Sequence, residues 1–205
     1  MTTPLPAARL PRMDDEAAPA PGGVDEAGGS AGAGRRLLLI GGRSGVGKTT
    51  VAWEVSALLR RREVAHCLVE GDNLDQVHPA PADDPHRSRI TERNLAAVWA
   101  NFEALGHRSL VYTNTVSVLE EDMFRRAMGG GDIRITRVLL TADDDTVRER
   151  LALRETGSQL LPHIGRSRRA ARLLDAEAPP DTVRVPTDGR TVEEVAAHVV
   201  AATAW

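Results

Sequence analysis

The chain has 205 residues, of which 41% are apolar and 27% charged, a composition typical of a soluble globular protein that forms one domain. A formal net charge of −3 argues against a general nucleic-acid-binding protein. Cys67 is the only cysteine, which excludes an intramolecular disulfide and a multi-cysteine metal site. No apolar run reaches the roughly 18 residues of a membrane-spanning helix, and the first residues lack a secretory signal pattern. We therefore expect a cytoplasmic protein that makes no membrane contact.

Residues 1–34 differ in composition from the rest of the chain. Nineteen of these residues are Ala, Pro or Gly. Such a segment buries too little apolar surface to offset the entropy lost when it becomes ordered. We therefore predict a disordered N-terminal tail over residues 1–34, followed by a single folded domain over residues 35–205.

From residue 35 onward, short apolar runs typical of buried strands alternate with stretches whose apolar residues recur at helical spacing. The predicted strands are 37–40, 64–69, 110–112, 133–140 and 183–185. The predicted helices are 49–62, 90–105, 118–128, 143–154, 166–174 and 192–202, the last of them opened by a capping box over residues 191–194. This alternation predicts an α/β fold with a parallel sheet covered by helices on both faces.

The strongest motif lies between the first predicted strand and the first predicted helix, where the chain matches G-x-x-x-x-G-K-[ST]. Its glycines let the backbone turn tightly and point N–H groups at an anion, and the helix N-terminus adds partial positive charge. Lys48 is the only lysine among 26 basic residues, at the one position where the wide fork of arginine would not fit. The predicted phosphate-binding residues are Gly42, Arg43, Ser44, Gly45, Val46, Gly47, Lys48, Thr49 and Thr50.

An acidic residue follows the second predicted strand. Asp72 lies where the strands of an open α/β sheet end, which is where the reactive crevice of such folds lies. Asp72 can orient an acceptor hydroxyl, accept its proton, or bind Mg²⁺ through water, and the Thr49 hydroxyl can join the coordination sphere of Mg²⁺. The alternative is a strand-end turn, which Gly71 and Asn73 also favour. Asp75 is a weaker candidate for contact with the substrate, and Glu70 receives no assignment.

The pairing of GGRSGVGKTT with VEGDNLDQ resembles the small P-loop kinases of metabolites. Adenylylsulfate kinases are the most similar in pattern, and gluconate, shikimate and chloramphenicol kinases share the layout. The resemblance covers residues 35–205 and rests on four segments, namely 42–50, 71–73, 148–172 and 187–190. It implies a three-layer P-loop NTPase fold with a five-stranded parallel sheet in the order 2-3-1-4-5, ATP-dependent phosphoryl transfer, and an acceptor-side position for Asp72.

An arginine-rich segment follows the fourth predicted strand and is expected to form a lid over about residues 150–172. Arg150 and Arg154 lie four residues apart on one helical face and can stabilise charge on the transferring phosphoryl group. The alternative is a solvated charged helix. The resemblance also implies that the loop 187–190 packs against adenine, and we expect Arg190 to lie near the base.

Three more residues are candidates for contact with the acceptor. Arg89 and Arg93 precede or begin the helix 90–105 and would suit an anionic acceptor, although a solvated helix turn explains them equally well. Asn114 follows the third strand and can orient an acceptor or a water molecule. No carboxylate ends that strand, so Mg²⁺ would rest on Thr49, the nucleotide and Asp72.

These features support two hypotheses. The favoured one is an ATP- and Mg²⁺-dependent kinase that transfers the γ-phosphoryl group to a hydroxyl or an anionic group of a small-molecule acceptor, which is a metabolite, a nucleoside or nucleotide, or an antibiotic. Its catalytic residues would be Lys48, Asp72, Arg150 and Arg154. The alternative is a regulatory or accessory ATPase without an acceptor, which the uncharged end of the third strand favours only if Glu120 or Glu121 serves the metal. A switch GTPase is excluded, because its Asn-Lys-x-Asp motif needs a second lysine.

Overall fold

The computed structural model describes residues 34–154 and 160–205. The predicted tail, apart from Gly34, and residues 155–159 of the predicted lid lie outside the described residues. The described strands are β1 (Arg35–Gly41), β2 (Cys67–Glu70), β3 (Ser109–Thr113), β4 (Ile133–Thr141) and β5 (Val183–Pro186). The described α-helices are α1 (Lys48–Arg61), α2 (Ser88–Ala104), α3 (Glu121–Ala127), α4 (Asp144–Arg154), α5 (Leu160–Glu177) and α6 (Val192–Ala201). Two short 3₁₀ helices, η1 (Gly71–Asn73) and η2 (Ser117–Leu119), follow β2 and β3.

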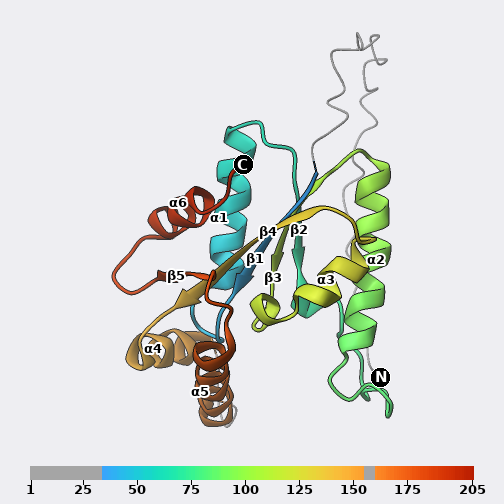
Figure 1. Ribbon diagram of the computed structural model, residues 1–205. Coiled ribbons are helices and arrows are strands. Elements are labelled where there is room, and N and C mark those ends of the chain that lie inside the picture. The colour runs from blue at the N-terminus through green and yellow to red at the C-terminus, as the bar shows by residue number, and fades with distance from the viewer. Residues whose placement is uncertain (1–33, 155–159) are drawn as a thin grey trace, which may run out of the picture. The chain divides into compact units, whose positions relative to one another are not determined.

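The sheet has the predicted order. Its five described strands run β2-β3-β1-β4-β5, and every neighbouring pair is parallel. Helices α1 and α6 lie on one side of the sheet and α2 and α3 on the other, while α4 and α5 lie toward the ends of the strands (Figure 1). The prediction of an α/β fold with a parallel sheet covered on both faces is therefore confirmed.

The central strand β1 supplies side chains to both sides of the sheet. Leu38 and Ile40 lie in the core that includes α1 and α6, whereas Leu37 and Leu39 lie in the core that includes α2 and α3. All four side chains are fully buried, as the period of two along a strand requires when both faces are covered. This burial fixes β1, and with it the loop that follows Gly41.

Several predicted boundaries were wrong. The second strand begins at Cys67 rather than at residue 64, because Glu63 adopts a left-handed φ of 57° and the chain after it connects α1 to the sheet. The helix predicted over 118–128 is divided into η2 and α3. Helix α5 begins at Leu160, earlier than predicted, because Pro162 in its first turn loses no helical hydrogen bond. In the described part of the chain, no helix is long and apolar enough to cross a membrane.

Candidate active site

The loop between β1 and α1 has the backbone of an anion cradle. Gly45 and Gly47 both have a φ of 92°, which favours glycine. Gly42 has a φ of 144°, and a Cβ atom there would lie 2.7 Å from the Leu140 carbonyl oxygen. The amides of Gly45, Gly47 and Lys48 form no backbone hydrogen bond with another described residue. These amides therefore remain available to a bound anion, and the loop fits the phosphates of a nucleotide.

The side chain of Lys48 lies within this cradle. Its Nζ atom donates a hydrogen bond to the Arg43 carbonyl oxygen at 3.4 Å. Burial lowers the pKa of Lys48, and the negative charge of Asp72 opposes that shift. Lys48, Asp72 and Arg154 line one pocket of about 500 Å³. The structure thus brings three of the predicted catalytic residues to one place.

A carboxylate that the sequence left unassigned contacts the predicted metal ligand. The Thr49 hydroxyl donates a hydrogen bond to Glu70 Oε1 at 2.5 Å. Glu70 ends β2 and lies opposite Thr113 of β3 in the sheet register. Strand β3 has no acidic residue at its end, and Glu70 of the neighbouring strand β2 supplies a carboxylate beside Thr49 instead. The sequence signal that could have identified Glu70 is its position at the end of β2, two residues before Asp72.

The oxygen atoms of Thr49, Glu70 and Asp72 suit Mg²⁺ in their chemistry, because this hard cation prefers oxygen ligands. Among residues 34–154 and 160–205, no group of three or more His, Cys, Asp and Glu side chains could hold a metal ion by itself. Mg²⁺ is usually bound by one or two carboxylates together with substrate phosphates, and Glu70 and Asp72 offer two carboxylates.

Asp72 lies in η1 and is held by the end of β3. Asn114 Nδ2 donates a hydrogen bond to Asp72 Oδ1 at 2.8 Å, which unites two residues predicted to contact the acceptor. Burial raises the pKa of Asp72. Lys48 opposes the shift, and the negative charges of Glu70 and Asp75 add to it. A carboxylate with a raised pKa beside a cation is a suitable group to accept a proton from a hydroxyl.

Gly71 permits the turn that places Asp72. A Cβ atom at Gly71 would lie 2.1 Å from the Tyr112 hydroxyl oxygen, and Tyr112 is buried. We predict that Gly71→Ala lowers the stability of the protein by about 1–3 kcal/mol through overpacking. Thermal unfolding measures this loss.

Gly165→Ala is the matched control for that substitution. In α5 the nearest described atom to an added Cβ lies 3.8 Å away, on the Arg169 side chain. Alanine is the better helix former, so we expect this variant to gain about 0.5–1 kcal/mol. Equal stability of Gly71→Ala and the natural protein would contradict the close packing of Tyr112.

The arginines around the cradle have different roles. Arg43 is buried, and its guanidinium donates hydrogen bonds to Asp144 Oδ1 at 2.5 Å and to the Ala142 carbonyl at 3.0 Å. This side chain is not among the described residues that line the phosphate pocket. The Arg43 side chain therefore joins the loop to the start of α4. Ser167 of α5 also donates to the loop, at the Ser44 carbonyl, over 2.8 Å.

A second pocket, of about 350 Å³, adjoins the cradle on the side of α6. Its lining includes the predicted nucleotide-binding residues Thr50 and Arg190. Arg150 also lines it and donates hydrogen bonds to Thr187 Oγ1 at 2.9 Å and to the Thr187 carbonyl at 3.2 Å. It donates a further bond of 3.5 Å to the Gly45 carbonyl. Arg150 thus links the cradle to the loop after β5.

A family model described as "AAA domain" matches residues 38–173 of the chain. The chain belongs to the AAA domain family. Three solved structures resemble this AAA domain protein in fold. A gluconokinase from Sinorhizobium meliloti 1021 has 21% identity, covers 82% of this chain and 90% of its own, and gives a TM-score of 0.51. A tunicamycin resistance protein from Deinococcus radiodurans has 18% identity, coverages of 82% and 94%, and a TM-score of 0.52.

The third structure is a shikimate kinase from Bacteroides thetaiotaomicron, with 15% identity, coverages of 80% and 95%, and a TM-score of 0.50. The chain therefore has the fold of small P-loop kinases, and the resemblance stated from the motifs is confirmed at the level of fold and family. No sequence among the curated proteins matches this AAA domain protein.

We predict that Arg150→Ala weakens ATP binding by this AAA domain about tenfold, because it removes charged hydrogen bonds that hold two walls of the second pocket together. Arg148→Ala is the control, since Arg148 lies on the same helix and pairs only with the exposed Asp145 among the described residues. A calorimetric titration of ATP separates the two variants. Equal ATP affinities of Arg150→Ala and Arg148→Ala would contradict a role of Arg150 in nucleotide binding.

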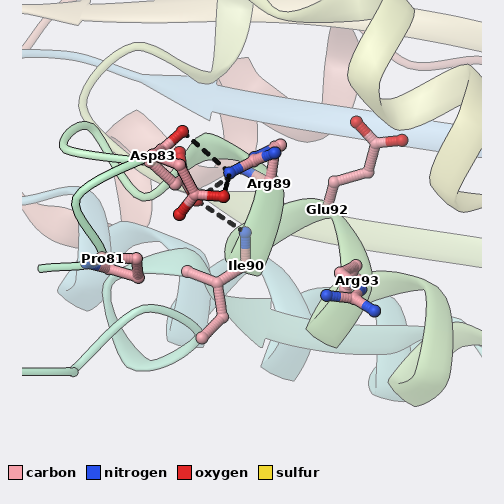
Figure 2. A pocket seen from close by; sticks show the side chains of 7 residues that line it. Pro81, Asp83, Arg89, Ile90, Glu92 and Arg93 are labelled. Atoms are coloured by element: carbon pink, nitrogen blue, oxygen red, sulfur yellow. Dashed lines mark hydrogen bonds and ion pairs between the residues drawn. The ribbon is translucent and has the colours of Figure 1, made fainter.

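Arg89 and Arg93 lie away from the cradle, in a third pocket of about 610 Å³ at the start of α2. Figure 2 shows the Arg89 guanidinium turned toward Asp83, with which it forms an ion pair. The Arg93 side chain makes no hydrogen bond or ion pair with another described residue. No described residue of this pocket also lines the phosphate pocket. The structure does not bring these two arginines into contact with Lys48 or Asp72.

Proposed function

We propose that the protein is an ATP-dependent phosphotransferase that moves the γ-phosphoryl group to a hydroxyl of a small-molecule acceptor. The observation that carries this proposal is the single pocket in which Lys48 of the cradle and Asp72 from the end of β2 lie together. Lys48 is suited to bind the phosphates of the donor, and Asp72 is suited to contact the acceptor hydroxyl. The fold shared with small-molecule kinases supports the same reading.

In this proposal the residues act chiefly by positioning and by electrostatic stabilisation. The cradle amides and Lys48 bind the phosphates, and Arg154 offsets charge that develops on the transferring group. Asp72, oriented by Asn114, receives the proton of the acceptor hydroxyl. Mg²⁺ held near Thr49 and Glu70 would offset the negative charge of the phosphate oxygens.

The alternative of an accessory ATPase has less support. The uncharged end of the third strand favours it only if Glu120 or Glu121 serves the metal, yet neither is among the described residues that line the phosphate pocket. Glu121 instead forms ion pairs with Arg125 and Arg137. The acid beside Thr49 is Glu70.

ATP consumption by the purified chain, measured with and without a panel of metabolites, tests the proposal. We expect slow hydrolysis alone and a large increase with at least one hydroxyl-bearing compound, which then carries the phosphate. Rapid hydrolysis that no compound stimulates would favour the ATPase instead.

A further inference from the structure

A smaller hollow adjoins the phosphate pocket and has no role in the mechanism above. It has a volume of about 190 Å³ and lies between the first turns of α1 and the ends of β2 and β3. Helix α1 contacts both of these strands, and β2 is an edge strand of the sheet. Thr49 and Glu70 line both the hollow and the phosphate pocket. A ligand in the hollow would therefore lie next to the transferring phosphate.

The floor of the hollow contains a buried hydroxyl without a partner. Thr113 is 2% exposed, and its Oγ1 atom forms no hydrogen bond with another described residue. Val111, two residues earlier on the same face of β3, belongs to the core beneath α1, so Thr113 also faces α1. A buried hydroxyl that lacks a partner is costly and rare in folded proteins. Its place in the lining of a hollow indicates a polar group of a ligand.

One wall of the hollow is an exposed aromatic ring. Trp53 lies one helical turn after Thr49 and is 58% exposed, although it is a large apolar side chain. Ala52 and Leu68 extend the apolar wall. An indole ring offers a broad flat face on which a planar ring can stack. The hollow thus joins a flat apolar wall to a polar floor.

Charge and size narrow the class of ligand. Among the described residues that line the hollow, Glu70 alone is charged, so in the absence of Mg²⁺ an anionic group would be repelled there. The volume is smaller than the roughly 300–1,000 Å³ of pockets for drug-sized ligands, which suits a single ring. We infer that the hollow binds a neutral planar ring of the phosphoryl acceptor, stacked on Trp53 and hydrogen-bonded to Thr113. This inference rests on the proposed function and names the class of its acceptor.

Tryptophan fluorescence of the full chain tests the hollow directly. Uridine and benzyl alcohol serve as planar neutral probes, glycerol as a neutral probe without a ring, and gluconate as an anionic one. We expect at least one planar probe to quench emission in the natural protein and not in Trp53→Phe, with no effect of glycerol or gluconate. No quenching by either planar probe, or equal quenching by gluconate, would overturn the inference.

Two variants of Thr113 separate a ligand-binding hydroxyl from a structural one. Thr113→Val removes the unpaired hydroxyl, so we expect the unfolding midpoint to rise by about 2–4 °C. We also expect planar-probe affinity to fall about tenfold. Thr113→Ser should retain most of that affinity. Unchanged probe affinity in Thr113→Val, or a loss confined to Mg²⁺-nucleotide binding, would contradict the inference.

The probes are titrated without nucleotide, and the nucleotide analogue AMP-PNP with Mg²⁺ is titrated separately. Failure of the analogue to bind would refute the proposed function, whereas failure of the planar probes would refute only the hollow.

Discussion

Lys48→Met is expected to lower kcat/KM for phosphoryl transfer about 10³-fold. Removal of one preorganised group that stabilises transition-state charge typically costs about 10²–10³ in rate, and loss of ground-state phosphate binding adds to this. Methionine matches the length and apolar volume of the lysine stem, so the change removes the charge and leaves the packing of the cradle. Lys48 is the only lysine in the chain, so no second lysine side chain can replace it.

Two further variants make the Lys48 result specific. Lys48→Arg keeps the positive charge, but the planar guanidinium is too wide for the cradle, so we expect it to be nearly as inactive as Lys48→Met. Arg60→Met removes an exposed cation from the last turn of the same helix and should keep full activity. Activity retained by Lys48→Met would contradict the assignment of the cradle.

Asp72→Asn is expected to reduce kcat by about 10²–10⁴-fold, the range that a positioned general base contributes. The amide keeps the size of the side chain and one oxygen for the bond from Asn114, but it cannot accept the proton of a hydroxyl. Nucleotide binding, which depends on the cradle, should remain close to that of the natural protein. Equilibrium titration of an ATP analogue together with steady-state kinetics separates the two effects.

The pH profile gives a second test of Asp72. Its pKa is raised by burial and by the neighbouring charges of Glu70 and Asp75, with Lys48 opposing. A base acts only when deprotonated, so activity should fall on the acid side at a pH above the ordinary range of a carboxylate. In Asp75→Asn one negative neighbour is lost, and the acid limb should move to lower pH. An acid limb that stays in place would exclude Asp72 as the base.

The fold was predictable because its strongest signals are local. The apolar run from Leu37 to Ile40, the glycine loop and the amphipathic helix after it each follow from neighbouring residues. The start of β2 at Cys67 was not predictable. The turn before it depends on a left-handed backbone at Glu63, and glutamate rarely adopts that conformation. The strand order came from the resemblance, since no single stretch of sequence encodes which strands are neighbours.

The candidate site was predictable only in part, because several of its contacts join distant segments. Glu70 reaches Thr49 across 21 positions of sequence, and Arg43 reaches Asp144 across 101. The sequence therefore assigned Arg43 to the nucleotide as a member of the loop, whereas the structure places its side chain on α4. The sequence assigns no role to Thr113, and it indicates only that no carboxylate ends the third strand. Its burial without a partner becomes visible only when β3 and α1 are placed together.

Binding of Mg²⁺-AMP-PNP to the full chain, followed by isothermal titration calorimetry, tests the central claim most directly. The cradle around Lys48 predicts saturable binding at one site, weakened at least about tenfold in Lys48→Met. Absence of any heat of binding with adenine or guanine triphosphate analogues, in a preparation that unfolds cooperatively, would contradict the claim that this loop binds a nucleotide.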